Sequence, residues 1–205
     1  MTRKLILVCG LSATGKSRWC GYVLHLLYSR GENPKFFDID EVRERTWGER
    51  ARSLTAAEHR FKNEVTCFEV KKAFILGAEV VLLNMVMPTK RLHQQPFMEM
   101  VRDTERILNE IRVDRGQEIE PVKVKIDVRA IWCDCNEETA RRRLAERAKG
   151  THVSDLNDIK VWLDNKSWFE PPDEENYPYI WIDTSHESVA AEQIRVEQVS
   201  QFLFG

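Results

Sequence analysis

The sequence predicts an α/β protein with a parallel sheet of about five strands wrapped by helices. Leu5 to Cys9 is a continuous apolar run, which is typical of a strand buried on both faces of a parallel sheet. A glycine-containing loop follows, and then Trp19 to Tyr28, where apolar residues recur at helical spacing. Further apolar runs alternate with helical segments along the chain, and this alternation favours a parallel sheet over an antiparallel one.

The next elements have separate signals. Gly31 ends the first helix, because glycine is a common residue just past a helix end. Lys35 to Ile39 is the second predicted strand, and a helix starts at Asp40. Glu79 to Asn84, mostly valine and leucine, is the third strand.

A capping box lies between the second and third strands. Thr55 is followed three residues later by Glu58, a spacing that lets each satisfy the backbone of the other at a helix start. The helix that follows stops at Gly77. One of its faces carries four apolar residues, namely Phe61, Val65, Phe68 and Ile75.

In the second half, Pro96 begins a helix that lasts to about Val113, and Val122 to Cys133 is a long strand. Asn136 is a suitable N-cap for the arginine-rich helix after it. The remaining predicted elements are a helix at 137–149, a helix at 154–168, a strand at 179–183 and a helix at 188–203. We find no repeat or linker, and residues 1–205 are predicted to form a single domain.

The loop after the first strand fits the pattern G-x-x-x-x-G-K-[ST]. Its residues are Gly10, Leu11, Ser12, Ala13, Thr14, Gly15, Lys16 and Ser17. In this motif the glycines let the backbone curl so that its N–H groups form a cradle for phosphate. The lysine reaches the β- and γ-phosphates and the Ser17 hydroxyl is a ligand for Mg²⁺. Because a strand precedes the loop and a helix follows it, a plain glycine turn is disfavoured, and we predict a nucleoside-triphosphate site.

Polar residues end the other predicted strands at the same edge of the sheet, where ligands bind in parallel α/β folds. They are Asp38, Asp40, Asn84 and Asp183. A carboxylate near the acceptor hydroxyl is what a kinase needs, and Asp40 is our candidate. The alternative is that Asp40 only caps the helix that it begins. Arg43, one turn further on, either holds an anionic part of the acceptor or is an ordinary surface arginine.

Composition narrows the classes of function. The chain has 31 Lys and Arg against 33 Asp and Glu, for a net charge of −2, so a protein dedicated to nucleic-acid backbones is disfavoured, although a local basic patch is not excluded. No apolar run approaches the length of a membrane span. The first strand begins almost at the first residue, which leaves no room for a signal peptide. The five scattered cysteines favour reduced core thiols in a cytoplasmic protein.

These motifs together resemble the P-loop kinases, a group that includes adenylylsulfate kinases, polynucleotide kinases, zeta-type toxins and antibiotic phosphotransferases. The resemblance rests on the glycine loop, on D-x-D-x-x-R at Asp38 to Arg43, on a strand that ends in a polar residue, and on a late R-x-x-x-R helix. It covers about Leu5 to Thr184. It implies a P-loop NTPase fold with an arginine-bearing lid at about residues 136–153, and it implies ATP and Mg²⁺ as cofactors.

By this resemblance Asp40 matches the catalytic carboxylate, Arg43 the acceptor-binding arginine, and Arg143 and Arg147 the arginines of the lid. Asn84 stands where an aspartate often ends the third strand. Because an asparagine brings no negative charge to the magnesium site, Asp38 is the alternative residue to hold the metal's water shell. Arg91, in the loop after the third strand, is a further candidate for contact with the acceptor.

The spacing of charges along the arginine-rich helix divides its arginines into two groups. Arg141 and Arg142 each follow a glutamate by four residues, which is the favoured spacing for ion pairs on a helix surface. Arg143 and Arg147 instead face each other, one turn apart. Such a pair at the edge of the core suggests an anion between them, and a salt-bridged surface is the alternative.

The leading hypothesis is therefore a kinase that moves the γ-phosphoryl of ATP to a hydroxyl of a small-molecule or nucleotide-like acceptor. A polynucleotide end kinase and a kinase-type toxin remain alternatives. A nucleotide-switch GTPase is less favoured, because Asn165 to Trp168 lacks the aspartate of the N-K-x-D motif. A motor-type ATPase is disfavoured by the uncharged Asn84.

Overall fold

Five parallel strands form one sheet, in the order β2-β3-β1-β4-β5. The computed structural model describes residues 1–48, 54–86, 94–116, 123–149, 158–172 and 174–205. The strands are β1 (Thr2–Cys9), β2 (Lys35–Asp38), β3 (Val80–Met85), β4 (Lys125–Asp134) and β5 (Tyr179–Asp183). The predicted α/β class and the five-stranded parallel sheet are confirmed.

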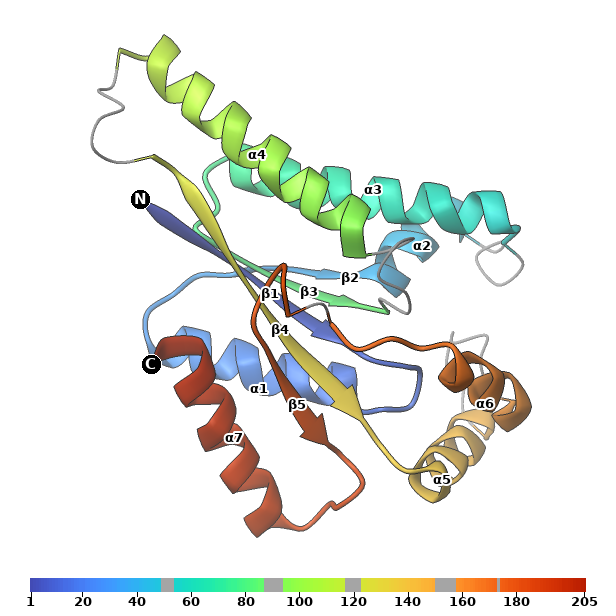
Figure 1. Ribbon diagram of the computed structural model, residues 1–205. Coiled ribbons are helices and arrows are strands. Elements are labelled where there is room, and N and C mark those ends of the chain that lie inside the picture. Colours follow the sequence, from blue (N-terminus) through green and yellow to red (C-terminus); the bar gives the residue numbers. More distant parts are fainter. Residues whose placement is uncertain (49–53, 87–93, 117–122, 150–157, 173) are drawn as a thin grey trace.

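Helices cover both faces of the sheet (Figure 1). The helices in the described part of the chain are α1 (Lys16–Ser29), α2 (Ile39–Trp47), α3 (Ala56–Ile75), α4 (Gln95–Asp114), α5 (Glu137–Ala148), α6 (Ile159–Ser167) and α7 (Val189–Phe204). Helices α2, α3 and α4 lie over one face, and α1 and α7 lie over the other. Helices α5 and α6 stand beyond the carboxyl ends of the strands, next to the glycine loop.

Each face of the sheet has its own apolar core. Leu5 and Leu7 of β1 point to the side of α3 and α4, whereas Ile6 and Val8 point to the side of α1 and α7. All four side chains are at most 2% exposed, which explains the unbroken apolar run of this central strand. A third, smaller cluster joins Leu11 and Ala13 of the glycine loop to α5 and α6, and Trp162 is its largest side chain.

Two predicted helix caps are confirmed, and two predicted helix starts are wrong. Thr55 and Glu58 form the predicted capping box, and Asn136 caps α5 through the N–H of Thr139. Helix α6 begins at Ile159, with Asp158 as its cap, and not at residue 154 as the sequence suggested; residues 154–157 lie outside the described part. Helix α2 begins at Ile39, one residue before the predicted start.

Helix α3 turns a different face to the core than its sequence suggests. Thr66, Val70 and Phe74 are buried against the sheet side. Phe61 and Phe68, from the apolar stripe seen in the sequence, are 53% and 62% exposed. Periodicity identifies an apolar stripe, but it does not show which of two stripes meets the sheet.

The five cysteines are free, as predicted. Burial raises the pKa of the Cys9 thiol to about 12, so little of it is thiolate at neutral pH. Among the described residues, none of the helices combines the length and the apolar composition that crossing a bilayer requires.

Candidate functional site

The glycine loop connects β1 to α1 through three residues with positive φ. Gly10 has φ 144°, Ala13 64° and Gly15 83°. A side chain at Gly10 has no room, because a Cβ there would lie 2.2 Å from the carbonyl oxygen of Cys133 on β4. Gly10 is thus required both by its backbone angle and by the close approach of the neighbouring strand.

We expect Gly10→Ala to destabilise the protein by about 2–4 kcal/mol, because the added methyl must push β4 or the loop aside and the backbone angle is strained as well. Thermal and urea unfolding of the variant measure this. Gly21→Ala is the matched control, because a Cβ at Gly21 in α1 meets no atom within 4 Å. Equal stability of the Gly10 variant and the wild type would contradict the close approach.

Three consecutive carbonyl groups of the loop are held from outside it. The oxygen of Ser12 accepts a hydrogen bond from the Trp162 indole at 2.8 Å, and that of Thr14 accepts one from the Thr184 hydroxyl at 2.9 Å. Between them, the oxygen of Ala13 accepts one from Arg143 at 3.0 Å. The loop is therefore fixed by α6, by α5 and by the segment after β5.

Helix α1 begins at this loop without a side-chain cap. Gly15 is its N-cap residue, in the left-handed conformation, and makes no side-chain hydrogen bond. No acidic residue lies in the first turn. The N-terminus of α1 thus offers backbone N–H groups and a partial positive charge, which together attract an anion such as phosphate.

Lys16 lies at the mouth of the loop. Its Nζ donates to the carbonyl oxygen of Leu11 at 2.7 Å. Burial lowers the pKa of Lys16, and the Asp40 carboxylate opposes this effect. Asp40 also acts on the pKa of Arg147, which burial lowers. The charge of the Asp40 carboxylate thus favours the protonated forms of both cations beside the loop.

Asp38, and not Asp40, caps α2. The Oδ1 of Asp38 accepts the backbone N–H of Asp40 at 2.8 Å, so the alternative that Asp40 serves only as the cap is wrong. The other carboxylate oxygen of Asp38 accepts the amide of Asn84 at 2.6 Å. The carboxylate of Asp40 is left 59% exposed at the end of the sheet.

Arg43 is a buried residue, which contradicts the alternative of an ordinary surface arginine. It is only 6% exposed. One of its terminal nitrogens lies 3.5 Å from a carboxylate oxygen of Asp40. Arg43 therefore lies on the same face of α2 as Asp40, one turn further on and more deeply buried, as its spacing predicted.

The two arginines of α5 have different surroundings. Arg143 donates to the hydroxyl and the carbonyl oxygen of Thr184 at 3.0 and 2.7 Å and pairs with Glu187 at 2.9 Å. Arg147 reaches the loop itself, where it donates to the Ser12 hydroxyl at 3.1 Å. Arg143 thus ties the glycine loop to the segment after β5, whereas Arg147 contacts the loop through the Ser12 side chain.

The outer arginines of α5 belong to the surface, in part as expected. Arg141 pairs with Glu137 at 2.5 Å. Arg142 pairs with Glu146 at 3.4 Å, one of the two glutamates within reach by helical spacing, and also with Glu187 at 2.8 Å. Bonds to Arg143 and Arg142 lower the pKa of Glu187, so this carboxylate links the helix to the segment after β5.

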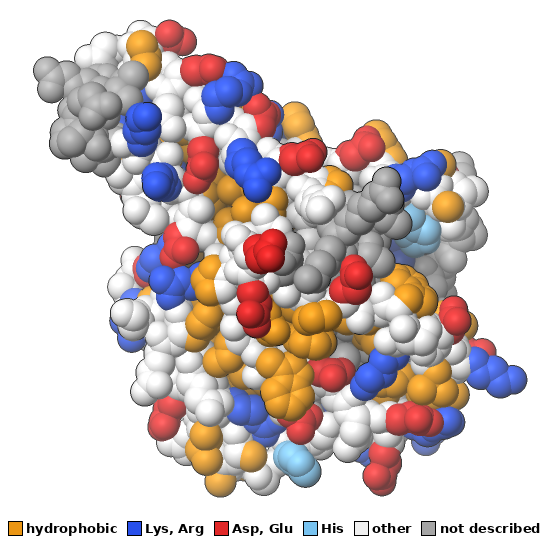
Figure 2. Space-filling model, viewed as in Figure 1, with side chains coloured by type: hydrophobic (Ala, Val, Ile, Leu, Met, Phe, Trp, Pro, Cys, Tyr) orange, Lys and Arg blue, Asp and Glu red, His pale blue; other side chains and the backbone are white. Residues whose placement is uncertain are grey.

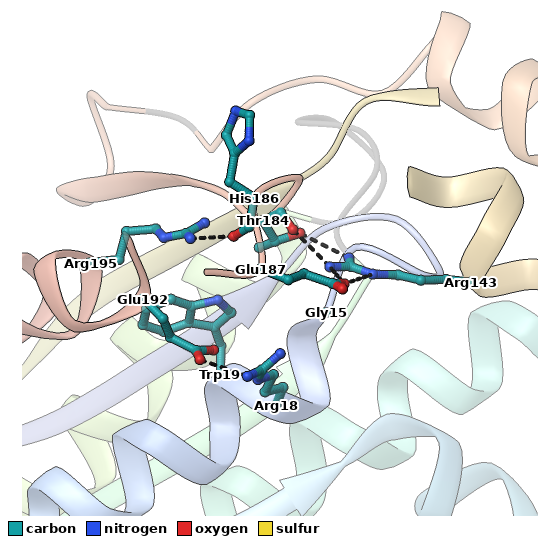
Figure 3. A pocket seen from close by; sticks show the side chains of 9 residues that line it. All are labelled: Gly15, Arg18, Trp19, Arg143, Thr184, His186, Glu187, Glu192 and Arg195. Atoms are coloured by element: carbon teal, nitrogen blue, oxygen red, sulfur yellow. Dashed lines mark hydrogen bonds and ion pairs between the residues drawn. The ribbon is translucent and has the colours of Figure 1, made fainter. Parts of the chain in front are cut away.

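A pocket opens beside the loop, between α1, α5, α7 and the segment after β5 (Figure 3). The residues that line it include Gly15 and Trp19 of the loop and α1, Arg143 of α5, and Thr184 and Glu187 after β5. A second groove runs across Ala13 and Gly15 between Arg143 and Arg147. The sequence did not mark Thr184, Glu187 or Trp162 as site residues. The position of Thr184 directly after the last strand was the one available signal, since ligands bind at this edge.

Two predicted features cannot be placed. Arg91 lies outside the described residues, as does the end of the predicted lid, residues 150–153. Asp183 does end β5 at the expected edge, but its carboxylate accepts the backbone N–H of Ser185 and thus shapes the turn there.

The residues at the loop fit a magnesium ion held with a nucleotide. Mg²⁺ is usually bound through one or two protein oxygens, with phosphates and waters as the remaining ligands. Ser17 is exposed at the start of α1. The Oδ1 atom of Asn84 is buried and has no hydrogen-bond partner in the described part of the chain, so it can accept a bond from a metal-bound water. The described residues contain no cluster of three or more His, Cys, Asp or Glu for a metal.

The strand, the glycine loop and the uncapped helix define a P-loop nucleotide-binding protein. The chain belongs to the AAA domain family, which it matches over residues 5–172. No curated protein sequence gave a significant match.

Three of the solved structures with a similar fold are kinases whose names or bound ligands point to small-molecule substrates. A sugar kinase from a Janibacter species has a TM-score of 0.62 at 14% identity, over 98% of this chain and 94% of that chain. Shikimate kinase from Acinetobacter baumannii, in complex with shikimate, has a TM-score of 0.55 at 14% identity, over 98% and 93%. An APS kinase from Mycobacterium tuberculosis, in complex with AMPPNP and APS, has a TM-score of 0.52 at 18% identity, over 99% and 98%. These structures confirm the fold that the resemblance to the P-loop kinases implied.

Proposed function

We propose that the protein transfers the γ-phosphoryl group of ATP to a hydroxyl group of a small-molecule or nucleotide-like acceptor. The observation that carries this proposal is the position of Asp40. Its carboxylate is 59% exposed and lies 3.5 Å from the buried Arg43, and its charge raises the pKa of Lys16 and Arg147 against the lowering by burial. A carboxylate at this place can orient an acceptor hydroxyl and take its proton.

In this mechanism the loop holds the nucleotide. Backbone N–H groups from Gly10 to Gly15 and the N-terminus of α1 bind the phosphates, and Lys16 leaves the carbonyl oxygen of Leu11 to bind the β- and γ-phosphates. Ser17 would ligate Mg²⁺, and Asp38 and Asn84 would accept bonds from its waters. The metal ion would neutralise charge on the phosphates.

The chemical step then involves α2 and α5. Asp40 takes the proton of the acceptor hydroxyl while the hydroxyl oxygen bonds to the γ-phosphorus, and the bond to the β-phosphate oxygen breaks to release ADP. Arg147 stabilises the negative charge on the equatorial oxygens of the transferring group. Arg43, buried behind Asp40, holds that carboxylate in place and offers a positive charge to an anionic acceptor.

A polynucleotide end kinase is less well supported. Such an enzyme needs a continuous basic surface for the phosphate backbone. On the face shown in Figure 2, acidic and basic side chains are interspersed across the described residues, in keeping with the net charge of −2. No observation favours a toxin over a metabolic kinase.

The test is incubation of the protein with ATP, Mg²⁺ and separate hydroxyl compounds, among them sugars, shikimate-like cyclic alcohols, nucleosides and oligonucleotides. We expect one class to raise ADP formation well above the rate with water alone, with a phosphorylated product visible by mass spectrometry. Stimulation by oligonucleotides alone would support the end kinase instead. ATP hydrolysis that no hydroxyl compound stimulates would contradict the proposal.

Asp40→Asn should lower kcat with the true acceptor by about 10²-fold or more, since a positioned base contributes on this scale. The affinity for ATP should hardly change, because the carboxylate serves the acceptor. Steady-state kinetics and nucleotide titration separate the two effects. Glu41→Gln, on the exposed side of the same turn, is the matched control. If ATP binding is lost while kcat survives, Asp40 belongs to the metal site and its assigned role is wrong.

A further inference from the structure

Helix α3 is apolar on two opposite faces. One is covered by the sheet, and the other is largely exposed, although Phe61 at its start lies edge-on to Trp47 of α2 at 6.0 Å between ring centroids. Val70 and Phe74 are fully buried against the sheet side, with Thr66 beside them. At about 100° per residue, Thr66 and Val70 point about 160° away from Phe68. Phe68 is therefore directed almost straight out of the molecule, and it is 62% exposed.

The outward face is a continuous stripe and not a single residue. Phe61, Phe68 and Ile75 follow one another at intervals of seven, with exposed fractions of 53%, 62% and 37%. Residues at this interval drift by only about 20° per step around a helix. Leu76, 76% exposed, extends the stripe at its end. We call these four residues the α3 stripe. Aligned apolar side chains of this size on the surface mark an interface.

Charged residues flank the centre of the stripe in an ordered way. Glu64 lies one turn before Phe68 and is exposed; among the described residues it has no hydrogen bond or ion pair. Lys71 and Lys72 lie one turn after Phe68. Lys71 pairs with Asp103 on α4, and Lys72 lies 3.9 Å from Glu69. The acidic and basic sides of the stripe are thus separated by its central phenylalanine.

We propose that the α3 stripe is the interface of a homodimer, in which α3 packs antiparallel against α3 of a second copy with Phe68 at the two-fold axis. An antiparallel copy brings its Glu64 beside Lys71 and Lys72, and the reverse contact is formed at the same time. It also sets Phe61 against Ile75 and Leu76 of the other chain. A parallel copy would place Glu64 beside Glu64 and lysines beside lysines. The stripe is thus complementary to itself in one orientation.

The position of the stripe agrees with such a partner. Helix α3 lies over the face of the sheet that α2 and α4 also cover, and α1, which carries the phosphate loop, lies on the other face (Figure 1). A seven-residue repeat favours helices that cross at about 20°. The dimer would leave the pocket beside Gly15 open in both copies. The proposal of a dimer does not depend on which acceptor is phosphorylated.

The first test measures mass. Sedimentation velocity over a range of concentrations should give a dimer for the wild type and a monomer for Phe68→Glu, with association weakened about 100-fold or more because two carboxylates meet at the axis. Val189→Glu is the matched control, since Val189 is 80% exposed on α7 and away from the stripe. A wild type that is monomeric at several hundred micromolar would overturn the proposal, as would a Phe68→Glu protein that stays dimeric.

The second test measures the orientation. Glu64→Lys should weaken the dimer, and Glu64→Lys combined with Lys72→Glu should restore it, because the charges are exchanged and not removed. In a Cys67→Ser background, Phe68→Cys should form a disulfide between two chains under mild oxidation, since residues on a two-fold axis meet their own copies. Cross-linking of Val189→Cys to the same extent, or failure of the double variant to restore the dimer, would overturn the antiparallel arrangement.

Discussion

Lys16→Ala should abolish phosphoryl transfer, with a loss of about 10³-fold or more in kcat, while the fold stays nearly intact. The proposed partner of the lysine is the nucleotide, and removal of one positioned charge at a transition state costs on this scale. Its hydrogen bond within the protein is to the carbonyl oxygen of Leu11. That oxygen lies in a loop that Trp162, Thr184 and Arg143 already hold, so the loop should keep its shape.

Two measurements decide this prediction. Phosphoryl transfer is followed with a coupled ADP assay, and stability by thermal unfolding without nucleotide. Lys35→Ala, an exposed lysine at the start of β2, controls for loss of a positive charge alone. Normal turnover by a well-folded Lys16 variant would remove the P-loop interpretation of the site.

Arg147→Ala should lower kcat by about 10³-fold and weaken ATP binding far less. An arginine that closes over the transferring phosphoryl group acts mainly on the transition state, where charge spreads over the equatorial oxygens. Arg147 is suited to this role because it reaches over the loop to Ser12. The control is Arg141→Ala, on the same helix and paired with Glu137 at the surface, which should change little. Equal, small effects at both positions would contradict a catalytic role of Arg147 and would mean that α5 is only a charged surface helix.

Arg143 should respond differently from Arg147, although the sequence treats them alike. It bonds to Thr184, Ala13 and Glu187, so Arg143→Ala should lower the melting temperature as well as kcat. Unfolding of the two variants in parallel separates the structural contribution of Arg143 from the catalytic contribution of Arg147.

Much of the candidate site could be predicted because it is local in the sequence. The glycine loop, its strand and its helix are contiguous, and their chemistry follows from spacing. Asp38 and Asn84 could be placed together because parallel strands end at one edge, and their side chains do meet at 2.6 Å. The alternative that Asp40 caps α2 was wrong by two residues, because aspartates at 38 and 40 both suit a cap and only the backbone decides between them.

The remaining contacts could not be predicted because they join residues far apart in the chain. The bonds from Arg143 to Thr184 and Glu187 depend on how α5 sits against the segment after β5, which helical periodicity does not encode. Trp162 showed an apolar spacing but not the backbone oxygen that its indole reaches. For α3 the periodicity was read correctly as a stripe, yet the helix has two, and packing on the sheet selects the one with Val70 and Phe74.

The hydrogen bonds that hold the glycine loop come from residues late in the chain, and this has a consequence for folding during synthesis. Thr14 is held by a residue 170 positions later in the chain, and Ser12 by one 150 positions later. During synthesis the N-terminal part of a chain emerges and folds first. The loop would then exist for most of that time without the bonds that fix it, and would acquire its shape only when α6 and the segment after β5 arrive. Nucleotide capture should therefore begin late in translation, and nascent chains that end before Thr184 should be released without a competent site.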